Sequence, residues 1–224
     1  MDIFSACGVR IATVLMMSVV LLSSCSKAPT MRAGVATEKI TPTVFPFWLS
    51  GYAARKSPTS EVRQDIFAKA LALEDPSGNR TVIVTMDIIG IPRQLRDAIA
   101  SEVEAQQGLK PEALMLNSSH THSGPAIREN LEILFSFDDA EKQRTARYRK
   151  FLQDQIVKTV GDALQSLQPA HLAYGVGSAP FAINRRGLRM EELDPASNPG
   201  KPVDHSVPVL RVEGQDGKLL AVLF

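Results

Sequence analysis

The chain has 224 residues, of which 44% are hydrophobic and 22% are charged. This balance is typical of a globular protein with a core and excludes a wholly disordered chain, and the length suits one domain of ordinary size or two small ones. The 25 Lys and Arg residues nearly cancel the 24 Asp and Glu residues, giving a formal net charge of +1. Non-specific nucleic-acid binding usually needs a strong cationic field, so nucleic acid is not expected as a partner.

The first 25 residues have the order of a signal segment. A short polar start with Arg10 precedes an apolar run of 12 residues over 11–22, and residues 22–25 read Leu-Ser-Ser-Cys. The run is shorter than the roughly 20 residues that span a bilayer, and small residues before a cysteine suit a processing enzyme. The segment resembles a bacterial lipoprotein signal peptide. A buried hydrophobic helix with an incidental cysteine is the competing interpretation.

The signal-peptide resemblance implies that Cys25 is the lipidated first residue of an exported protein, anchored to the membrane in the bacterial cell envelope. Ser26 follows the cysteine, which favours the outer membrane. Both cysteines, Cys7 and Cys25, lie in this segment, so the remaining chain has no internal disulfide or Cys-based metal site. Residues 26–32 are mostly small and polar and are expected to form a tether, with the folded part over residues 33–224.

The folded part is predicted to begin with an extended segment and a β-hairpin. Residues 33–40 can extend before Thr41-Pro42 stops them. Residues 66–74 and 80–87 are rich in apolar and β-branched residues, and they flank a Pro-Ser-Gly-Asn sequence that favours a turn. A hairpin is therefore expected over residues 66–87.

An amphipathic helix is predicted after Pro92. Leu95, Ile99 and Val103 recur every four residues, and Gly108 stands where a helix would end.

The remaining elements alternate. Residues 113–119 read as a short strand, residues 139–167 as a long helix and residues 171–176 as another strand. The chain closes with strands over residues 207–212 and 219–224 around a Gly-Gln-Asp-Gly turn.

The alternation of strand, helix, strand, helix and strand favours parallel pairing with right-handed crossovers. The predicted fold class is α/β: a layered mixed sheet with a βαβαβ core and flanking β-hairpins. The last apolar run ends at Phe224 with no turn, cap or polar tail after it, so we expect the chain to be truncated at the C-terminus.

Polar residues follow two neighbouring predicted strands. Asp87 closes one, and residues 118–125, Ser-Ser-His-Thr-His-Ser-Gly-Pro, close the next. Ligands of open α/β sheets bind outside the carboxyl ends of the strands. In an extended backbone His120 and His122 point to the same side, where they can converge on a metal ion or a substrate group. A solvated pair of loop histidines is the alternative. Asp87 can orient a ligand histidine or satisfy backbone donors, and the sequence leaves both open.

Residues 116–125, LNSSHTHSGP, resemble the signature of the neutral/alkaline (non-lysosomal) ceramidases and their bacterial relatives. Other stretches agree with that family in the same order: residues 33–42, Gly51-Tyr52-Ala53 with Arg55, Asp65 before residues 68–75, residues 183–186, and Val203-Asp204 before residues 207–214. The resemblance covers nearly all of the expected exported chain.

The resemblance implies a zinc amidohydrolase that cleaves the amide of N-acylsphingosine to a fatty acid and sphingosine. His120 matches the first zinc ligand of the family, His122 matches the residue that assists at the substrate carbonyl, and Arg185 matches the arginine that helps hold the oxyanion. These roles are chemically consistent, because zinc lowers the pKa of a bound water to about 7 and cationic donors stabilise charge on the carbonyl oxygen.

The family's second zinc histidine, glutamate, tyrosine and serine nucleophile would follow Phe224. His171 and His205 do not match the second ligand and are expected to be structural. The chain is therefore expected to hold the N-terminal part of a catalytic domain, with half of a metal site. Three interpretations stay open: a ceramidase-like zinc amidohydrolase, a related metal hydrolase acting on another amide or ester, and a non-catalytic lipoprotein fragment.

Overall fold

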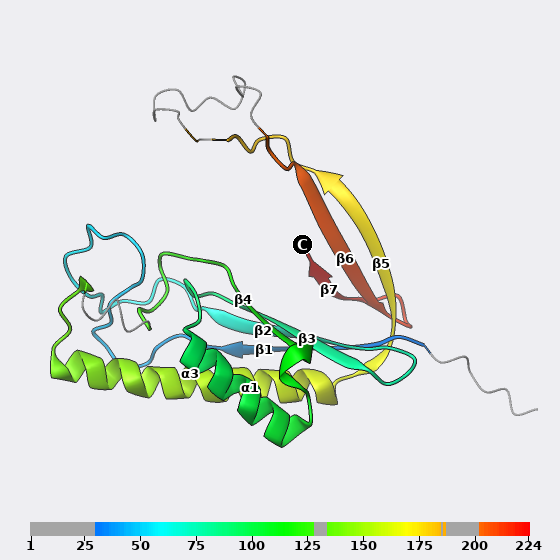
Figure 1. Cartoon of the computed structure of the whole chain (residues 1–224), viewed down its shortest axis with the longest axis horizontal. Helices are drawn as coiled ribbons and strands as arrows, with labels where there is room; N and C mark the ends of the chain where they lie inside the picture. The colour runs from blue at the N-terminus through cyan, green and yellow to red at the C-terminus, as the bar shows by residue number, and fades with distance from the viewer. Residues whose placement is uncertain (1–29, 128–133, 185, 187–201) are drawn as a thin grey trace, which may run out of the picture.

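The structure is a computed structural model that describes residues 30–127, 134–184, 186 and 202–224 (Figure 1). The described strands form one seven-stranded mixed sheet in the order β4-β3-β2-β1-β5-β6-β7. The elements are β1 (Arg32–Lys39), β2 (Phe67–Glu74), β3 (Arg80–Met86), α1 (Arg93–Gln107), a 3-10 turn at Pro111–Ala113, β4 (Leu114–Ser118), α3 (Asp139–Gln165), β5 (Gln168–Ser178), β6 (Ser206–Gly214) and β7 (Leu219–Leu223). The predicted mixed α/β sheet is confirmed.

The predicted hairpin is β2 and β3, which pair antiparallel along their whole length. Its turn is organised by the Asp75 carboxylate, which accepts hydrogen bonds from the backbone N–H groups of Ser77 at 2.8 Å and Asn79 at 2.9 Å. Gly78 has a φ of 85°, a conformation that glycine adopts without steric cost. Local side-chain bonding therefore explains why this hairpin could be read from the sequence.

Helix α1 also forms where the sequence predicts it. Leu95, Ile99 and Val103 are buried, as expected from their four-residue spacing. The helix ends at Gly108, whose φ of 67° and N–H bond to the Glu104 carbonyl make a left-handed cap.

Strand β4 lies beside β3 and runs parallel to it, with Met86 opposite Ser118. The backbone bonds continue past the strand ends, because the Ser119 N–H donates to the Met86 carbonyl at 2.9 Å and the His120 N–H donates to the Ile88 carbonyl at 3.1 Å. The β3–α1–β4 crossover thus brings Asp87 and the His-Thr-His segment to the same edge of the sheet.

Strand β5 departs from the predicted second parallel crossover. It pairs antiparallel with β1 through Arg32–Pro169 and Ala33–Gln168, on the far side of the sheet from β4. Helix α3, 27 residues long, contacts β1 and β2, so it carries the chain across the sheet before β5 begins. Just beyond the helix, the Leu167 carbonyl accepts a hydrogen bond from Arg32 of β1 at 2.8 Å, so β5 begins next to β1.

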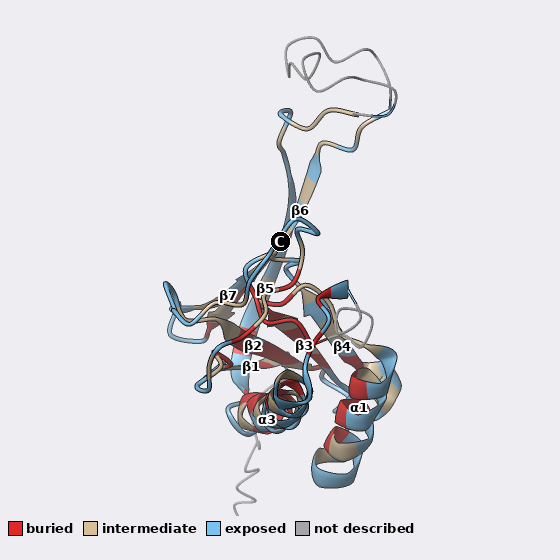
Figure 2. Cartoon of the chain, turned by 90° about the vertical axis from the view of Figure 1, so that its left-hand side faces the viewer, coloured by how far each residue is buried: buried red, intermediate tan, exposed pale blue. Residues whose placement is uncertain are grey.

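The main core lies between the sheet and the two helices, which cover the same face (Figure 1). Buried residues concentrate where the helices meet the strands (Figure 2). The largest fully buried side chains of the main core include Ile99 from α1, Val84 from β3 and Ile156 from α3. A smaller cluster on the opposite face joins Leu71 of β2 to Val212 of β6.

Beyond this body, β5 and β6 extend as a long arm (Figure 1). The part of the chain that the structure describes contains no helix that is long and apolar enough to span a membrane.

Candidate functional site

His120 and His122 lie in the loop that follows β4, and their ring centroids are 5.3 Å apart. The two rings are close enough to approach one small group. The backbone that brings them together is not extended as the sequence analysis assumed, because His120 has a φ of 57°. This left-handed conformation is uncommon for residues other than glycine, although histidine tolerates it better than most. A turn therefore produces the proximity.

The imidazole of His120 is oriented by the backbone of the neighbouring loop. Its Nδ1 lies 2.8 Å from the Ile89 carbonyl oxygen. A carbonyl only accepts hydrogen bonds, so Nδ1 carries the proton and Nε2 of the neutral ring keeps its lone pair. His120 is exposed, which leaves Nε2 accessible. Histidine ligands of metal ions are commonly fixed in this way.

The ring of His122 rests against Gly51 and Tyr52. A Cβ atom added at Gly51 would lie 2.3 Å from Cγ of His122, so only glycine fits beneath the ring. The Tyr52 ring meets the His122 ring edge to face, with centroids 4.9 Å apart. The Arg55 Nη2 donates to the His122 carbonyl oxygen at 3.1 Å. His122 is thus held from both its side chain and its backbone.

The rest of the histidine loop is bonded to residues 47–50. Ser50 is fully buried, and it donates its N–H to the Gly124 carbonyl at 2.8 Å and its hydroxyl to the Pro125 carbonyl at 3.0 Å. The Ala126 N–H donates to the Trp48 carbonyl at 2.7 Å. These bonds join two segments more than 70 residues apart.

Asp87 serves the backbone rather than a histidine. Its Oδ2 accepts from the Phe67 N–H at 3.0 Å, and its own N–H donates to the Phe67 carbonyl at 3.1 Å. None of the described histidines hydrogen-bonds to Asp87. The sequence left two roles open for Asp87, which are to orient a ligand histidine or to satisfy backbone donors. These contacts favour the second role.

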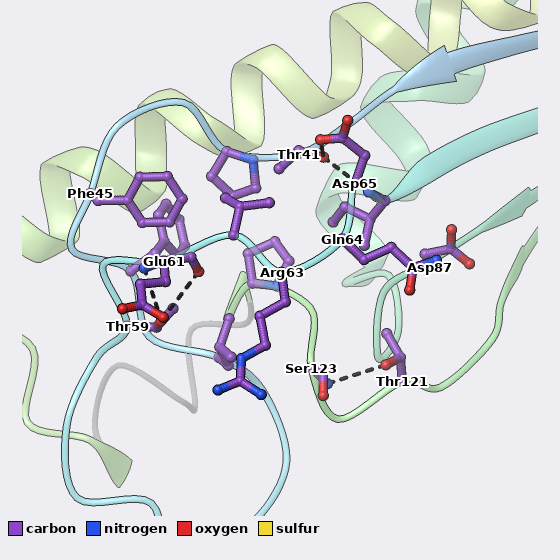
Figure 3. Close-up of a pocket in the computed structure, with 16 residues that line it drawn as sticks. Thr41, Phe45, Thr59, Glu61, Arg63, Gln64, Asp65, Asp87, Thr121 and Ser123 are labelled. Carbon is purple, nitrogen blue, oxygen red and sulfur yellow. Dashed lines mark hydrogen bonds between the residues drawn. The ribbon is translucent and has the colours of Figure 1, made fainter.

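A pocket of about 570 Å³ lies beside the histidine loop, with Thr121 and Ser123 in its wall (Figure 3). The neighbouring His120 and His122 do not line it. Its remaining walls come from residues 41–49 and 59–66, together with Asp87 and Pro125. Side chains of this loop therefore alternate between the histidine side and the pocket side.

Residues 31–223 match the family described as neutral/alkaline non-lysosomal ceramidase, N-terminal. The chain belongs to this family. The resemblance seen in the His-Thr-His segment and the motifs around it is thereby confirmed.

The chain is 30% identical over 188 residues to the neutral ceramidase of Pseudomonas aeruginosa strain PAO1, which covers 79% of this chain and 27% of that relative. It is similar to the crystal structure of neutral ceramidase from Pseudomonas aeruginosa, with a TM-score of 0.69, 24% identity, and coverage of 86% of this chain and 31% of the other. A ceramidase complexed with C2 matches with a TM-score of 0.70, 24% identity, and coverage of 86% and 30%. The chain thus spans less than a third of these ceramidases, and the two structures show the fold that it shares with them.

Among the residues that the structure describes, His120 is the one that the ceramidase resemblance matches to a zinc ligand. His120 presents an accessible Nε2 with its Nδ1 anchored, which suits a zinc ligand. Within the described ranges, no group of three His, Cys, Asp or Glu residues is arranged to hold a metal ion. His171 is exposed on β5, and Nε2 of His205 lies 3.3 Å from the Ala182 carbonyl oxygen.

Two predicted site residues lie outside the described residues: Arg185, matched by the ceramidase resemblance, and Cys25, matched by the signal-peptide resemblance. The sequence identifies Gly51, Tyr52 and Arg55 as positions that match the family and indicates no role for them. Their contact with His122 joins segments about 70 residues apart, and nothing in the local sequence signals it. The only hint was that Gly51-Tyr52 accompanies the histidine motif in the family.

Proposed function

We propose that this chain contributes the first metal-binding loop of a zinc-dependent amidohydrolase that cleaves the N-acyl amide of ceramide-like lipids to a fatty acid and a sphingoid base. The observation that carries the proposal is the paired, anchored imidazoles of His120 and His122 at the carboxyl end of β4, in a chain of the ceramidase family. Because the chain covers 27% of the neutral ceramidase that it resembles, the activity is assigned to the protein in which this loop meets a complete ligand set.

In this proposal the residues of the loop have distinct roles. His120 holds the metal through Nε2, because Nδ1 is occupied by the Ile89 carbonyl. His122, 5.3 Å away between ring centroids, donates a hydrogen bond to the substrate carbonyl oxygen. Arg185 adds a cationic donor to the same oxygen. Zinc, when bound, lowers the pKa of a coordinated water and polarises the carbonyl.

The experiment compares His120→Ala with His171→Ala. Both remove an exposed imidazole, but His171 lies on β5. We expect the protein in which this loop meets a complete ligand set to contain zinc by elemental analysis and to hydrolyse a short-chain ceramide. His120→Ala in that protein should lose both properties, whereas His171→Ala should keep both. Stoichiometric zinc in the His120→Ala protein would show that the ligand set lies elsewhere. Hydrolysis of a matched ester or a different amide in place of ceramide would support a related hydrolase.

A second candidate, a non-catalytic lipoprotein fragment, is favoured by one observation: no three-residue ligand group is present in the described part of the chain. A catalytic zinc site needs about three protein ligands. The 224-residue chain expressed alone is therefore expected to bind zinc weakly and to show little amidase activity. Chelator-sensitive ceramide hydrolysis by this chain would exclude the fragment.

The cellular location is part of the proposal. We infer that Cys25 is acylated and anchors the exported protein to the outer membrane, because an apolar run and small residues precede this cysteine. Growth with a radioactive fatty acid should label the wild-type protein and Cys7→Ser but not Cys25→Ser. An unlabelled wild-type protein that still begins at Met1 would contradict the assignment.

A further inference from the structure

We propose that Gly51, Tyr52 and Arg55 are positioning residues that hold the imidazole of His122 beside that of His120. The proposal rests on the proposed function for the role of His122. It goes further by assigning the orientation of that ring to a segment from a different part of the sequence.

Gly51 provides the space in which the His122 ring lies. A Cβ atom at this position would lie 2.3 Å from Cγ, 2.6 Å from Nδ1 and 2.7 Å from Cβ of His122. Three contacts below 3 Å cannot be relieved by a small rotation of the ring, because Cβ of the histidine is involved as well. Any larger residue at position 51 must therefore move the His122 side chain or the backbone beneath it.

Tyr52 forms the wall beside the ring. The residue is 64% exposed, so hydrophobic burial does not explain the position of its ring. Instead it meets His122 edge to face at 4.9 Å, and the Arg55 guanidinium carbon lies 5.8 Å from its centroid, within the range of a cation–π contact. The contacts of Tyr52 are thus directed at His122 and Arg55.

Arg55 fixes the backbone of His122. Its Nη2 donates to the His122 carbonyl oxygen at 3.1 Å, and its backbone N–H donates to the Tyr52 carbonyl at 2.9 Å. Its Nε is buried without a hydrogen-bond partner in the described structure. A buried donor without a partner is destabilising, so stability alone does not favour this placement of the guanidinium.

Unfavourable backbone conformations gather at the same place. Three non-glycine residues in the described part of the chain have a positive φ: Tyr52 at 32°, His120 at 57° and Ser136 at 53°. Two of the three flank the His122 ring. Strained residues of this kind cluster at functional sites, where the surrounding contacts hold them in place.

The decisive experiment compares Gly51→Ala with Gly78→Ala. Both glycines have a φ near 80°, so alanine introduces similar backbone strain at each. Only Gly51 lies beneath a histidine, because a Cβ at Gly78 meets nothing within 4 Å. We expect Gly51→Ala to shift the imidazole Cε1–H NMR signal of His122, assigned by its loss in His122→Gln, and Gly78→Ala to leave it unchanged. An unshifted His122 signal in folded Gly51→Ala would overturn the proposal.

A second variant, Tyr52→Ala, keeps Gly51 and removes only an exposed ring. Its control is Tyr174→Ala, because Tyr174 is 71% exposed and lies on β5. In the active protein, Tyr52→Ala and Arg55→Lys should lower kcat for amide hydrolysis by about 10- to 100-fold with little change in KM, because a displacement near 1 Å is enough for such a loss. Equal effects of Tyr52→Ala and Tyr174→Ala on the His122 signal would count against positioning. The NMR measurement needs no amidase activity, so a failure of the proposed function is distinguished from a failure of this proposal.

Discussion

Glu74 closes β2 with a carboxylate that is only 10% exposed and lies between two arginines. Arg80 Nε donates to Oε2 at 2.7 Å and Arg32 Nη1 donates to Oε1 at 2.6 Å. These hydrogen bonds hold the pKa of Glu74 below its ordinary value, and the bond from Arg80 has the largest effect. Because Arg32 belongs to β1 and Arg80 to β3, one carboxylate links three adjacent strands.

We predict that Glu74→Gln lowers the free energy of unfolding at pH 7 by about 1–3 kcal/mol, since the bonds lost are to charged groups. A carboxyl whose pKa is lowered by folding contributes stability above its unfolded pKa, near 4.3, and loses that contribution as the pH falls through the folded pKa. The difference in unfolding free energy between wild type and Glu74→Gln, measured by urea unfolding, should therefore shrink as the pH falls below the ordinary pKa of a glutamate. Glu104→Gln, exposed on α1, is the control. A gap that stays constant with pH would contradict the role of the charge.

The candidate site could be predicted from the sequence only in part. The His-x-His spacing and its place after a strand indicated two convergent imidazoles, and the rings do lie together. The left-handed φ of His120 could not be foreseen, because the residue is held by the Ile88 and Ile89 carbonyls of the loop after β3. Tertiary contacts of this kind leave no local pattern.

At the scale of elements, the sequence predicted the features that depend on residues close together in the chain. The hairpin turn at Asp75, the cap at Gly108 and the parallel pairing of β3 with β4 all follow from residues within or beside each element. The start of α3 is local too, since Asp138 and Glu141 form a reciprocal capping box.

The neighbour of β5 was not predictable in this way. A strand–helix–strand pattern favours a parallel neighbour, yet β5 pairs antiparallel with β1. The outcome depends on where α3 ends on the sheet, and Arg32 Nη2 marks that place by donating to the Leu167 carbonyl at 2.8 Å. Partner choice is a property of the assembled layers.

At the scale of the whole molecule, β4 and β7 form the two edges of the described sheet. Strand β7 is short and apolar, and Leu219 and Val222 are exposed on it. An apolar edge strand can pair with another chain, so the 224-residue chain expressed alone is expected to self-associate.

We predict that Val222→Lys reduces this self-association, because a charged side chain disfavours pairing at an edge. Val62→Lys is the matched control: the two valines are 45% and 47% exposed, but Val62 lies outside the strands. Sedimentation velocity at several protein concentrations should show fewer oligomers for Val222→Lys than for wild type or Val62→Lys. Equal reduction by both variants would indicate a general effect of charge.

The first strand of the fold occupies the middle of the sheet, and this has a consequence for the order of folding. Strand β1 pairs with β2, which is the next strand along the chain. On its other side, β1 contacts residues much later in the sequence, such as Leu167, which is 135 residues from Arg32. Closing so long a loop costs entropy before any contact offsets it, so such contacts form slowly. During synthesis, β1 to β4 can therefore assemble while one side of β1 still lacks its partner strand, and a chaperone that covers this unpaired side would protect the chain most at that stage.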